Sequence, residues 1–277
     1  MMTSPVTAVP YFDEAAPSAT AGDTTVLMLH GIGGGRQAFA RQMRPLADAG
    51  FHAVAWDMPG YGHSAIVDPY SLETLAEECI ELIDVLAPER LVLVGHSMGG
   101  MVAQEVVARA PERIAALVLA GTSAAFGKPD GAWQRTFIEE RSAPLDAGRS
   151  MRDLATQLVP GMLAADASRD LSNTARAEAI EVMAHVPPQT YRLALHALMD
   201  FDRHAQLAQL AMPVLLIAGG DDPNAPPRVM QGMAERIPNA RYVEIERCGH
   251  LMNFEQPEAF NTALIGFLRE IESGGTS

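Results

Sequence analysis

The sequence has few cysteines, a shortage of basic residues and no long apolar run, and each shortage excludes a class of protein. Its two cysteines, Cys79 and Cys248, form neither a disulfide framework nor a metal-binding spacing. We therefore expect no bound metal and a reducing, cytoplasmic environment. No apolar run is long enough to span a membrane. The first 19 residues lack a basic start and a continuous apolar core, so we expect no signal peptide.

Acidic residues strongly outnumber basic ones. The chain carries 34 acidic and 20 basic residues, which gives a formal net charge of −14. This balance disfavours nucleic acid or an anionic membrane as a partner and favours small, neutral or modestly charged molecules. With 277 residues and a hydrophobic content of 48%, the chain can form one α/β domain with an insertion, or two small domains.

Short apolar runs alternate with helical patterns along most of the chain. The apolar runs predict buried strands at residues 26–29, 52–56, 91–94, 114–119, 214–218 and 241–245, with an edge strand near 9–12. The helical patterns fall at 38–49, 72–86, 101–110 and 258–272. Strands that alternate with helices predict an α/β fold with a parallel, doubly wound sheet.

The alternation stops between residues 124 and 205, where helical patterns continue without a convincing strand. We therefore predict a core formed by residues 1–123 and 206–277, and a helical cap formed by residues 124–205. Because the insertion follows a strand directly, we expect the cap to lie over the carboxyl ends of the strands, where open α/β sheets bind ligands.

The predicted cap carries aromatic residues that are candidates for a substrate pocket. Trp133, Phe126 and Phe137 are the three that we assign to it. The cap also carries arginines that we expect on solvated helix faces, although one of them could meet a substrate carboxylate: Arg135, Arg141 and Arg149.

Residues 91–101 combine an apolar run, the pattern Gly-His-Ser-Met-Gly and the start of a helical pattern. A strand, a G-x-S-x-G turn and a helix form a nucleophile elbow, which lifts a serine hydroxyl above the end of a parallel sheet. The glycines two positions before and after the serine are expected because larger residues would be crowded in this strained turn. Ser97 is therefore the candidate nucleophile.

A serine hydroxyl needs an adjacent base, and the base needs an acid that orients it. His250 is the candidate base, because it lies in the loop that follows the last predicted strand. Asp222 is the candidate acid after the strand at 214–218, with Asp221 as its rival. The order serine, aspartate, histidine along the chain is the one found with this elbow.

Acyl transfer also needs two donors for the oxygen that becomes negative. We assign these to the backbone N–H groups of Met98, beside the nucleophile, and Ile32, in the glycine-rich loop after the first buried strand.

The sequence resembles the α/β-hydrolase superfamily over nearly its whole length. The matching motifs are His30-Gly31, Asp57-x-x-Gly60-x-Gly62-x-Ser64, Gly95-His96-Ser97-Met98-Gly99-Gly100, Pro111-Glu112-Arg113, Gly219-x-x-Asp222-x-x-x-Pro226 and Gly249-His250. In that superfamily the acid lies three residues after the glycine of the G-x-x-D motif, which implies Asp222. Among members with a cap, the chain looks most like the 3-oxoadipate enol-lactonases and related small carboxylesterases.

This resemblance implies a serine hydrolase that needs no cofactor and cleaves small esters or lactones through an acyl-enzyme. Two alternatives use the same three residues: hydrolysis of C–C bonds in meta-cleavage products, and cofactor-free perhydrolase or haloperoxidase activity. A dinucleotide-binding oxidoreductase is a remote alternative, because Gly33-x-Gly35-x-x-Ala38 and Asp57 imitate that fingerprint. A non-catalytic binding module on the same fold is a further one. The oligomeric state is left open.

Overall fold

The computed structural model describes residues 11–17, 23–127, 131–165 and 169–274. The described residues form a seven-stranded sheet in the order β1-β3-β2-β4-β5-β6-β7. Its strands are β1 Phe12–Ala15, β2 Thr24–Leu29, β3 His52–Trp56, β4 Arg90–His96, β5 Ala116–Ala120, β6 Val214–Gly219 and β7 Ala240–Ile245. Only β1 is antiparallel to its neighbour, β3. The predicted doubly wound, mostly parallel α/β sheet is therefore confirmed.

The central strands are apolar on both faces because both faces are covered. β2, β5 and β6 are buried along their whole length, and β4 is buried except at Arg90, which is half-buried. Continuous runs of Val, Leu, Ile and Ala are typical of parallel strands that have helices on each side. The edge strand β7 is partly exposed along most of its length.

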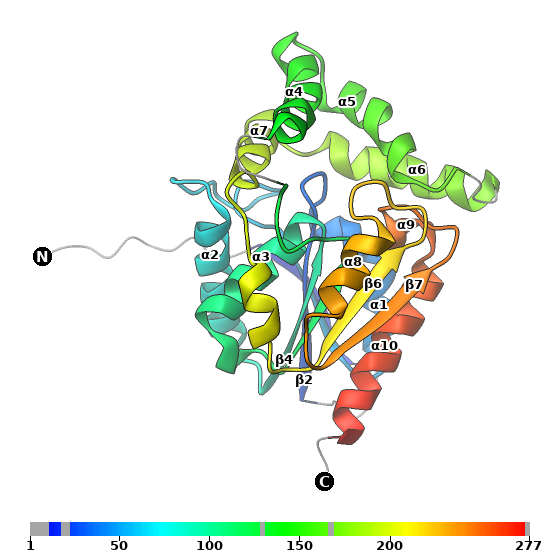
Figure 1. The fold of residues 1–277 in the computed structure, drawn as a ribbon. Helices are drawn as coiled ribbons and strands as arrows, with labels where there is room; N and C mark the ends of the chain where they lie inside the picture. The colour runs from blue at the N-terminus through cyan, green and yellow to red at the C-terminus, as the bar shows by residue number, and fades with distance from the viewer. Residues whose placement is uncertain (1–10, 18–22, 128–130, 166–168, 275–277) are drawn as a thin grey trace, which may run out of the picture.

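Helices cover the two faces of the sheet (Figure 1). α1 (Ala40–Asp48) packs against α10 (Pro257–Gly274) on one side, and α2 (Leu72–Leu86) packs against α3 (Met98–Arg109) on the other. α8 (Pro227–Ala234) contacts β6 and β7, and α9 (Met252–Glu255) is a single turn that follows the loop after β7.

Four helices, α4 to α7, lie above the ends of the strands, and we call them the upper helices (Figure 1). They are α4 Ala132–Asp146, α5 Met151–Leu158, α6 Arg169–Ala184 and α7 Pro188–Ala197, with the short 3₁₀ helix η3 Val159–Met162 after α5 and η4 His204–Gln209 after α7. The segments that lead into and out of this layer pair with each other: Ala125 bridges to Asp202, and the Phe126 N–H donates to the Phe201 carbonyl at 3.0 Å.

Several element boundaries differ from the sequence prediction. The helix expected at 38–49 is divided into a 3₁₀ turn, η1 (Arg36–Phe39), and α1. The strand expected at 114–119 begins only at Ala116, because η2 (Pro111–Arg113) and the bond from the Ile114 N–H to the Pro111 carbonyl form a turn first. The predicted edge strand near 9–12 corresponds to β1, but Val9 and Pro10 lie outside the described residues. No helix in the described ranges has both the length and the apolarity to cross a membrane.

Candidate active site

Ser97 lies in a sharp turn between β4 and α3, with a left-handed φ of 55° and a ψ of −121°. Such a conformation is uncommon for a residue with a side chain, and it projects Ser97 from the end of the strand. A Cβ atom on Gly95 would lie under 3.0 Å from the Gly99 carbonyl, and one on Gly99 would lie equally close to the Leu29 carbonyl. Both positions of the motif therefore require glycine for reasons of packing.

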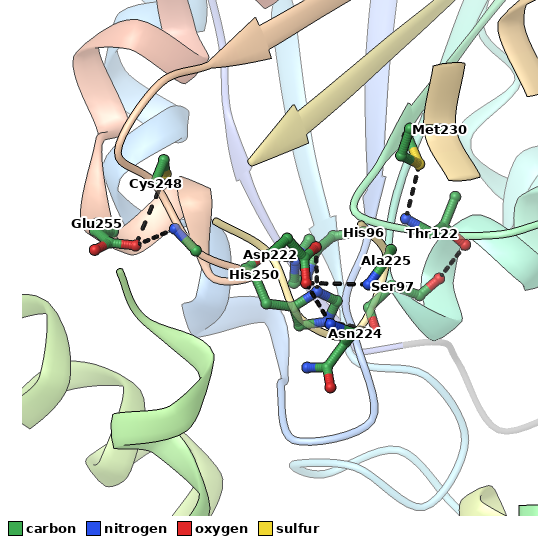
Figure 2. Close-up of polar contacts among 11 residues, drawn as sticks. His96, Ser97, Thr122, Asp222, Asn224, Ala225, Met230, Cys248, His250 and Glu255 are labelled. Atoms are coloured by element: carbon green, nitrogen blue, oxygen red, sulfur yellow. Dashed lines mark hydrogen bonds and ion pairs between the residues drawn. The ribbon is translucent and has the colours of Figure 1, made fainter. Parts of the chain in front are cut away.

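The structure brings Ser97, His250 and Asp222 together from three separate loops (Figure 2). The Ser97 Oγ lies 3.0 Å from His250 Nε2, and His250 Nδ1 lies 2.8 Å from Asp222 Oδ2. Because a carboxylate can only accept, the histidine Nδ1–H donates to Asp222, which leaves Nε2 free to accept from the serine hydroxyl. A neutral imidazole in this tautomer can take a proton from the serine.

The Asp222 carboxylate is held in its ionised form. Burial of the group, which is 3% exposed, acts to raise its pKa. The neighbouring His250 and backbone N–H donors from Asn224 and Ala225, at 2.7 and 3.0 Å, outweigh that effect, so the net pKa lies below the ordinary value. Asp221 has an exposed side chain, and its backbone N–H donates to the Cys248 carbonyl.

His96 lies behind the serine and supports the loop of His250. Its Nε2–H donates to the His250 carbonyl at 2.8 Å, and the two rings are 5.0 Å apart. Burial and the neighbouring His250 lower the pKa of His96 to about 3. His96 therefore stays neutral at physiological pH, and its Nε2–H is engaged by the His250 carbonyl.

The loop that carries His250 is held by hydrogen bonds to η3 and to Glu255 of α9. The His250 N–H donates to the Met162 carbonyl at 2.7 Å, which ties the loop to η3 below the upper helices. The buried Glu255 carboxylate accepts from the Gly249 N–H at 2.7 Å and from the Ala164 N–H at 2.9 Å (Figure 2 shows the first of these). No local sequence pattern indicated the contacts with Met162 and Ala164, because these residues lie about 90 positions from His250 and Glu255 along the chain.

The two predicted oxyanion donors line the same cavity as Ser97. Met98 is the first residue of α3, so its N–H has no acceptor within the helix, and Ile32 lies in the loop after β2. Neither N–H is hydrogen-bonded to any residue that the structure describes.

His30 fixes the loop that contains Ile32. Its Nδ1–H donates to the Gly31 carbonyl at 2.8 Å, and its Nε2 accepts from the Met58 N–H at 3.2 Å. The ring is fully buried, and burial lowers its pKa to about 4, so it is neutral at physiological pH. The loop therefore depends on one tautomer of His30.

The cavity above Ser97 has a volume of about 360 Å³ and extends between the sheet and the upper helices. Phe126, Trp133 and Phe137 all line it, and their ring centroids are 5.2 to 5.3 Å apart. Phe126 is buried, whereas Trp133 is 57% exposed. Trp133 is therefore not part of the core of the upper helices. The sequence did not single out three other lining residues, Met162, Met183 and Leu198.

The residues that imitated a dinucleotide fingerprint have a structural role. Asp57 is fully buried, and its carboxylate accepts from the Arg36 backbone N–H at 2.7 Å and from the Arg36 guanidinium. An acid engaged in this way is not free to bind a ribose hydroxyl. Within the described ranges, no group of histidine, cysteine, aspartate and glutamate side chains could hold a metal ion.

Residues 24–257 match the family model described as alpha/beta hydrolase fold, so this chain belongs to that family and is a hydrolase. A relative in Caulobacter sp. (strain K31), named as a candidate carbamate hydrolase, RutD, is 32% identical over 250 residues, which span 88% of this chain and 90% of the relative.

Two solved structures share the fold over almost the whole chain. A thermophilic esterase from Thermogutta terrifontis is 25% identical, with a TM-score of 0.82 over 95% of this chain and 93% of the esterase. The enol-lactonase from Burkholderia xenovorans LB400 is 26% identical, with a TM-score of 0.82 over 94% of this chain and 96% of the lactonase.

Proposed function

We propose that this hydrolase cleaves carboxylic esters or lactones of small molecules through an acyl-enzyme on Ser97. The observation that carries the proposal is the unbroken hydrogen-bond chain from Ser97 through His250 to Asp222 beside a cavity. Ser97 Oγ attacks the carbonyl carbon as its proton passes to His250 Nε2. Asp222 keeps His250 in the required tautomer and stabilises the imidazolium that forms.

The negative charge that develops on the carbonyl oxygen is stabilised by the N–H groups of Ile32 and Met98. Each donor of this kind contributes roughly 10²- to 10³-fold in kcat in a comparable serine hydrolase. When the tetrahedral intermediate collapses, His250 returns its proton to the leaving alkoxide. His250 then takes a proton from water, whose oxygen attacks the acyl-enzyme, and Ser97 recovers its proton as the acid leaves.

The substrate is a small molecule that residues 124–205 enclose as a cap. A cavity of about 360 Å³ falls at the lower end of the range for small-molecule sites. The esterase and the enol-lactonase of similar structure support the choice of an ester or lactone carbonyl. No cofactor takes part in these steps. We also propose a cytoplasmic location. Both cysteines are buried and unpaired, which is compatible with a reducing environment.

Carbamate hydrolysis is the second candidate, because the Caulobacter relative is named for it and is 32% identical. A carbamate carbonyl can be attacked by the same nucleophile and stabilised by the same two N–H donors. A substrate panel of ethyl esters, lactones, carbamates and a meta-cleavage diketone separates these reactions and also tests the C–C hydrolase alternative.

The nucleophile is tested with Ser97→Ala. This variant should lose about 10⁴-fold or more in kcat on the best substrate of the panel and retain its thermal midpoint, because the hydroxyl makes the bond. A fluorophosphonate should label the wild-type protein once per chain and leave the variant unlabelled. The matched control is Ser142→Ala, because the Ser142 hydroxyl donates to the Ile138 carbonyl within α4. Near wild-type turnover by Ser97→Ala would refute the proposal.

A further inference from the structure

Arg141, on α4, presents a guanidinium to the active-site cavity. Its side chain is only 12% exposed, and the guanidinium lies over the Phe137 ring, 3.5 Å from the centroid. Nη1 donates to the Phe137 carbonyl at 3.2 Å. Its one ion pair among the described residues is a distant one, 3.9 Å to the Glu140 carboxylate, and that side chain is 67% exposed. Most of the donors of this cation are therefore uncommitted.

Burial makes this cation costly for the protein. Burial lowers the pKa of Arg141, with weak opposition from Tyr191 and Glu140. A guanidinium nevertheless stays protonated in proteins, so the charge persists at physiological pH. A charge that is removed from water and lacks a close counter-ion destabilises the fold unless a ligand supplies the opposite charge.

Tyr191, on α7, provides a second donor in the same cavity. Tyr191 is buried, with 1% of the residue exposed, and it lines the cavity. Its hydroxyl is hydrogen-bonded to no residue that the structure describes. Burial raises the pKa of Tyr191 to about 12, while the charge of Arg141 opposes that rise. The hydroxyl therefore keeps its proton and can donate it to a ligand.

The cavity lining has the opposite charge balance to the whole chain. The chain carries 34 acidic residues, yet no aspartate or glutamate is among the described residues that line the cavity. The lining includes two arginines, Arg141 and the exposed Arg228, together with His250. An anionic ligand in this cavity would therefore not be repelled by a lining carboxylate and would be attracted by the two arginines.

We infer that Arg141 and Tyr191 form a subsite for a carboxylate that the substrate carries away from its scissile carbonyl. The inference rests on the proposed function and narrows its substrate class to small esters, lactones or carbamates with a free carboxylate group. The planar guanidinium offers two parallel N–H donors to such a carboxylate, and the tyrosine hydroxyl offers a third. The Phe137 ring, over which the guanidinium lies, helps to hold it in place.

The test compares two esters of matched shape, monoethyl glutarate and ethyl pentanoate, by titration of the released acid. Wild-type enzyme should prefer the charged ester in kcat/KM. Arg141→Gln should lose about 10- to 100-fold on monoethyl glutarate, mainly through KM, because a hydrogen bond to a charged group is removed. Its kcat/KM for ethyl pentanoate should change by less than about threefold, because the neutral ester has no group that interacts with Arg141. Tyr191→Phe should lose less than Arg141→Gln, in the same direction.

The matched control is Arg192→Gln, which removes a positive charge from α7 outside the cavity, where Arg192 pairs with Asp146. This control should leave the ratio between the two esters unchanged. An equal loss of preference in Arg141→Gln and Arg192→Gln would overturn the inference, because it would show a general effect of charge. A wild-type enzyme that hydrolyses ethyl pentanoate without preferring monoethyl glutarate would overturn the inference and leave the proposed function intact.

Binding of glutarate to the inactive Ser97→Ala protein gives an answer that does not depend on turnover. Calorimetry should detect binding in Ser97→Ala and a loss of about 10-fold or more after Arg141→Gln is added. Equal binding in both proteins, or binding in neither, would overturn the carboxylate subsite. A protein that binds glutarate at Arg141 but cleaves no ester, lactone or carbamate would instead refute the proposed function.

Discussion

Acidification should destabilise this protein through His30, the residue that holds the glycine loop. Its Nε2 accepts the Met58 N–H, and its Nδ1–H donates to the Gly31 carbonyl. Protonation of Nε2 would place a second N–H against that of Met58 and a charge on a ring that is 0% exposed. Burial therefore lowers the pKa of His30 from about 6.5 to about 4, against the raising effects of the Gly31 bond and Asp57.

The sign and size of the effect follow from the two pKa values. Between pH 6.5 and about 4, the unfolded chain binds a proton at His30 that the folded chain does not bind, so stability is present above this window and falls as the pH drops through it. Each unit of pKa difference is worth about 1.4 kcal/mol, so His30 should remove roughly 3 kcal/mol from the free energy of unfolding. His96, whose pKa is about 3, acts in the same direction.

The assay is urea unfolding at a series of pH values from 7 to 4, for wild-type protein and for His30→Asn. The variant should be less stable at pH 7 because both bonds are altered, but its stability should fall less steeply. The difference in the free energy of unfolding between wild type and His30→Asn should decrease by roughly 3 kcal/mol as the pH falls from 6.5 to about 4. The exposed His196, on α7, provides the control, and His196→Asn should follow the wild-type curve. Parallel curves for wild type and His30→Asn would refute the reasoning.

Two further predictions concern the site itself. Asp222→Asn should lower kcat by about 10⁴-fold, as the equivalent change does in a serine protease, whereas Asp221→Asn should lower it by less than about tenfold; equal losses in steady-state kinetics would remove Asp222 from its role. Trp133→Ala should shift the ratio of kcat/KM toward bulkier acyl groups and cost about 1 kcal/mol or less, because Trp133 is 57% exposed and its ring makes tilted contacts with Phe126 and Phe137. An unchanged ratio with a large fall in the melting temperature would place Trp133 in the packing of the upper helices instead.

The sequence was most informative where chain order alone decides position. Ser97, Asp222 and His250 each follow a parallel strand, so the carboxyl edge of the sheet collects them whatever the details of packing. The strand prediction at 52–56 and the helix prediction at 72–86 match β3 and α2 in both bounds, because strong apolar patterns and clear ends mark them.

The sequence was least informative where the outcome depends on contacts between distant segments. α8 and α9 were not predicted, since one begins among prolines and the other is a single turn. Helical periodicity could not decide which arginine of α4 and its neighbours turns inward, because that depends on how α4 packs above the sheet. The support that Met162 gives to the His250 loop has no local pattern either, because the two residues belong to distant segments.

The bond between the His250 N–H and the Met162 carbonyl limits how the insertion can be exchanged by engineering. The two backbones approach so closely that a Cβ atom on Gly249 would lie under 3.0 Å from that same carbonyl. A graft that replaces residues 124–205 would therefore remove an acceptor that holds the base, as well as the roof of the cavity. Chimeras that keep η3 native and exchange only α4 and α7 preserve this junction, and they change the roof without disturbing the base.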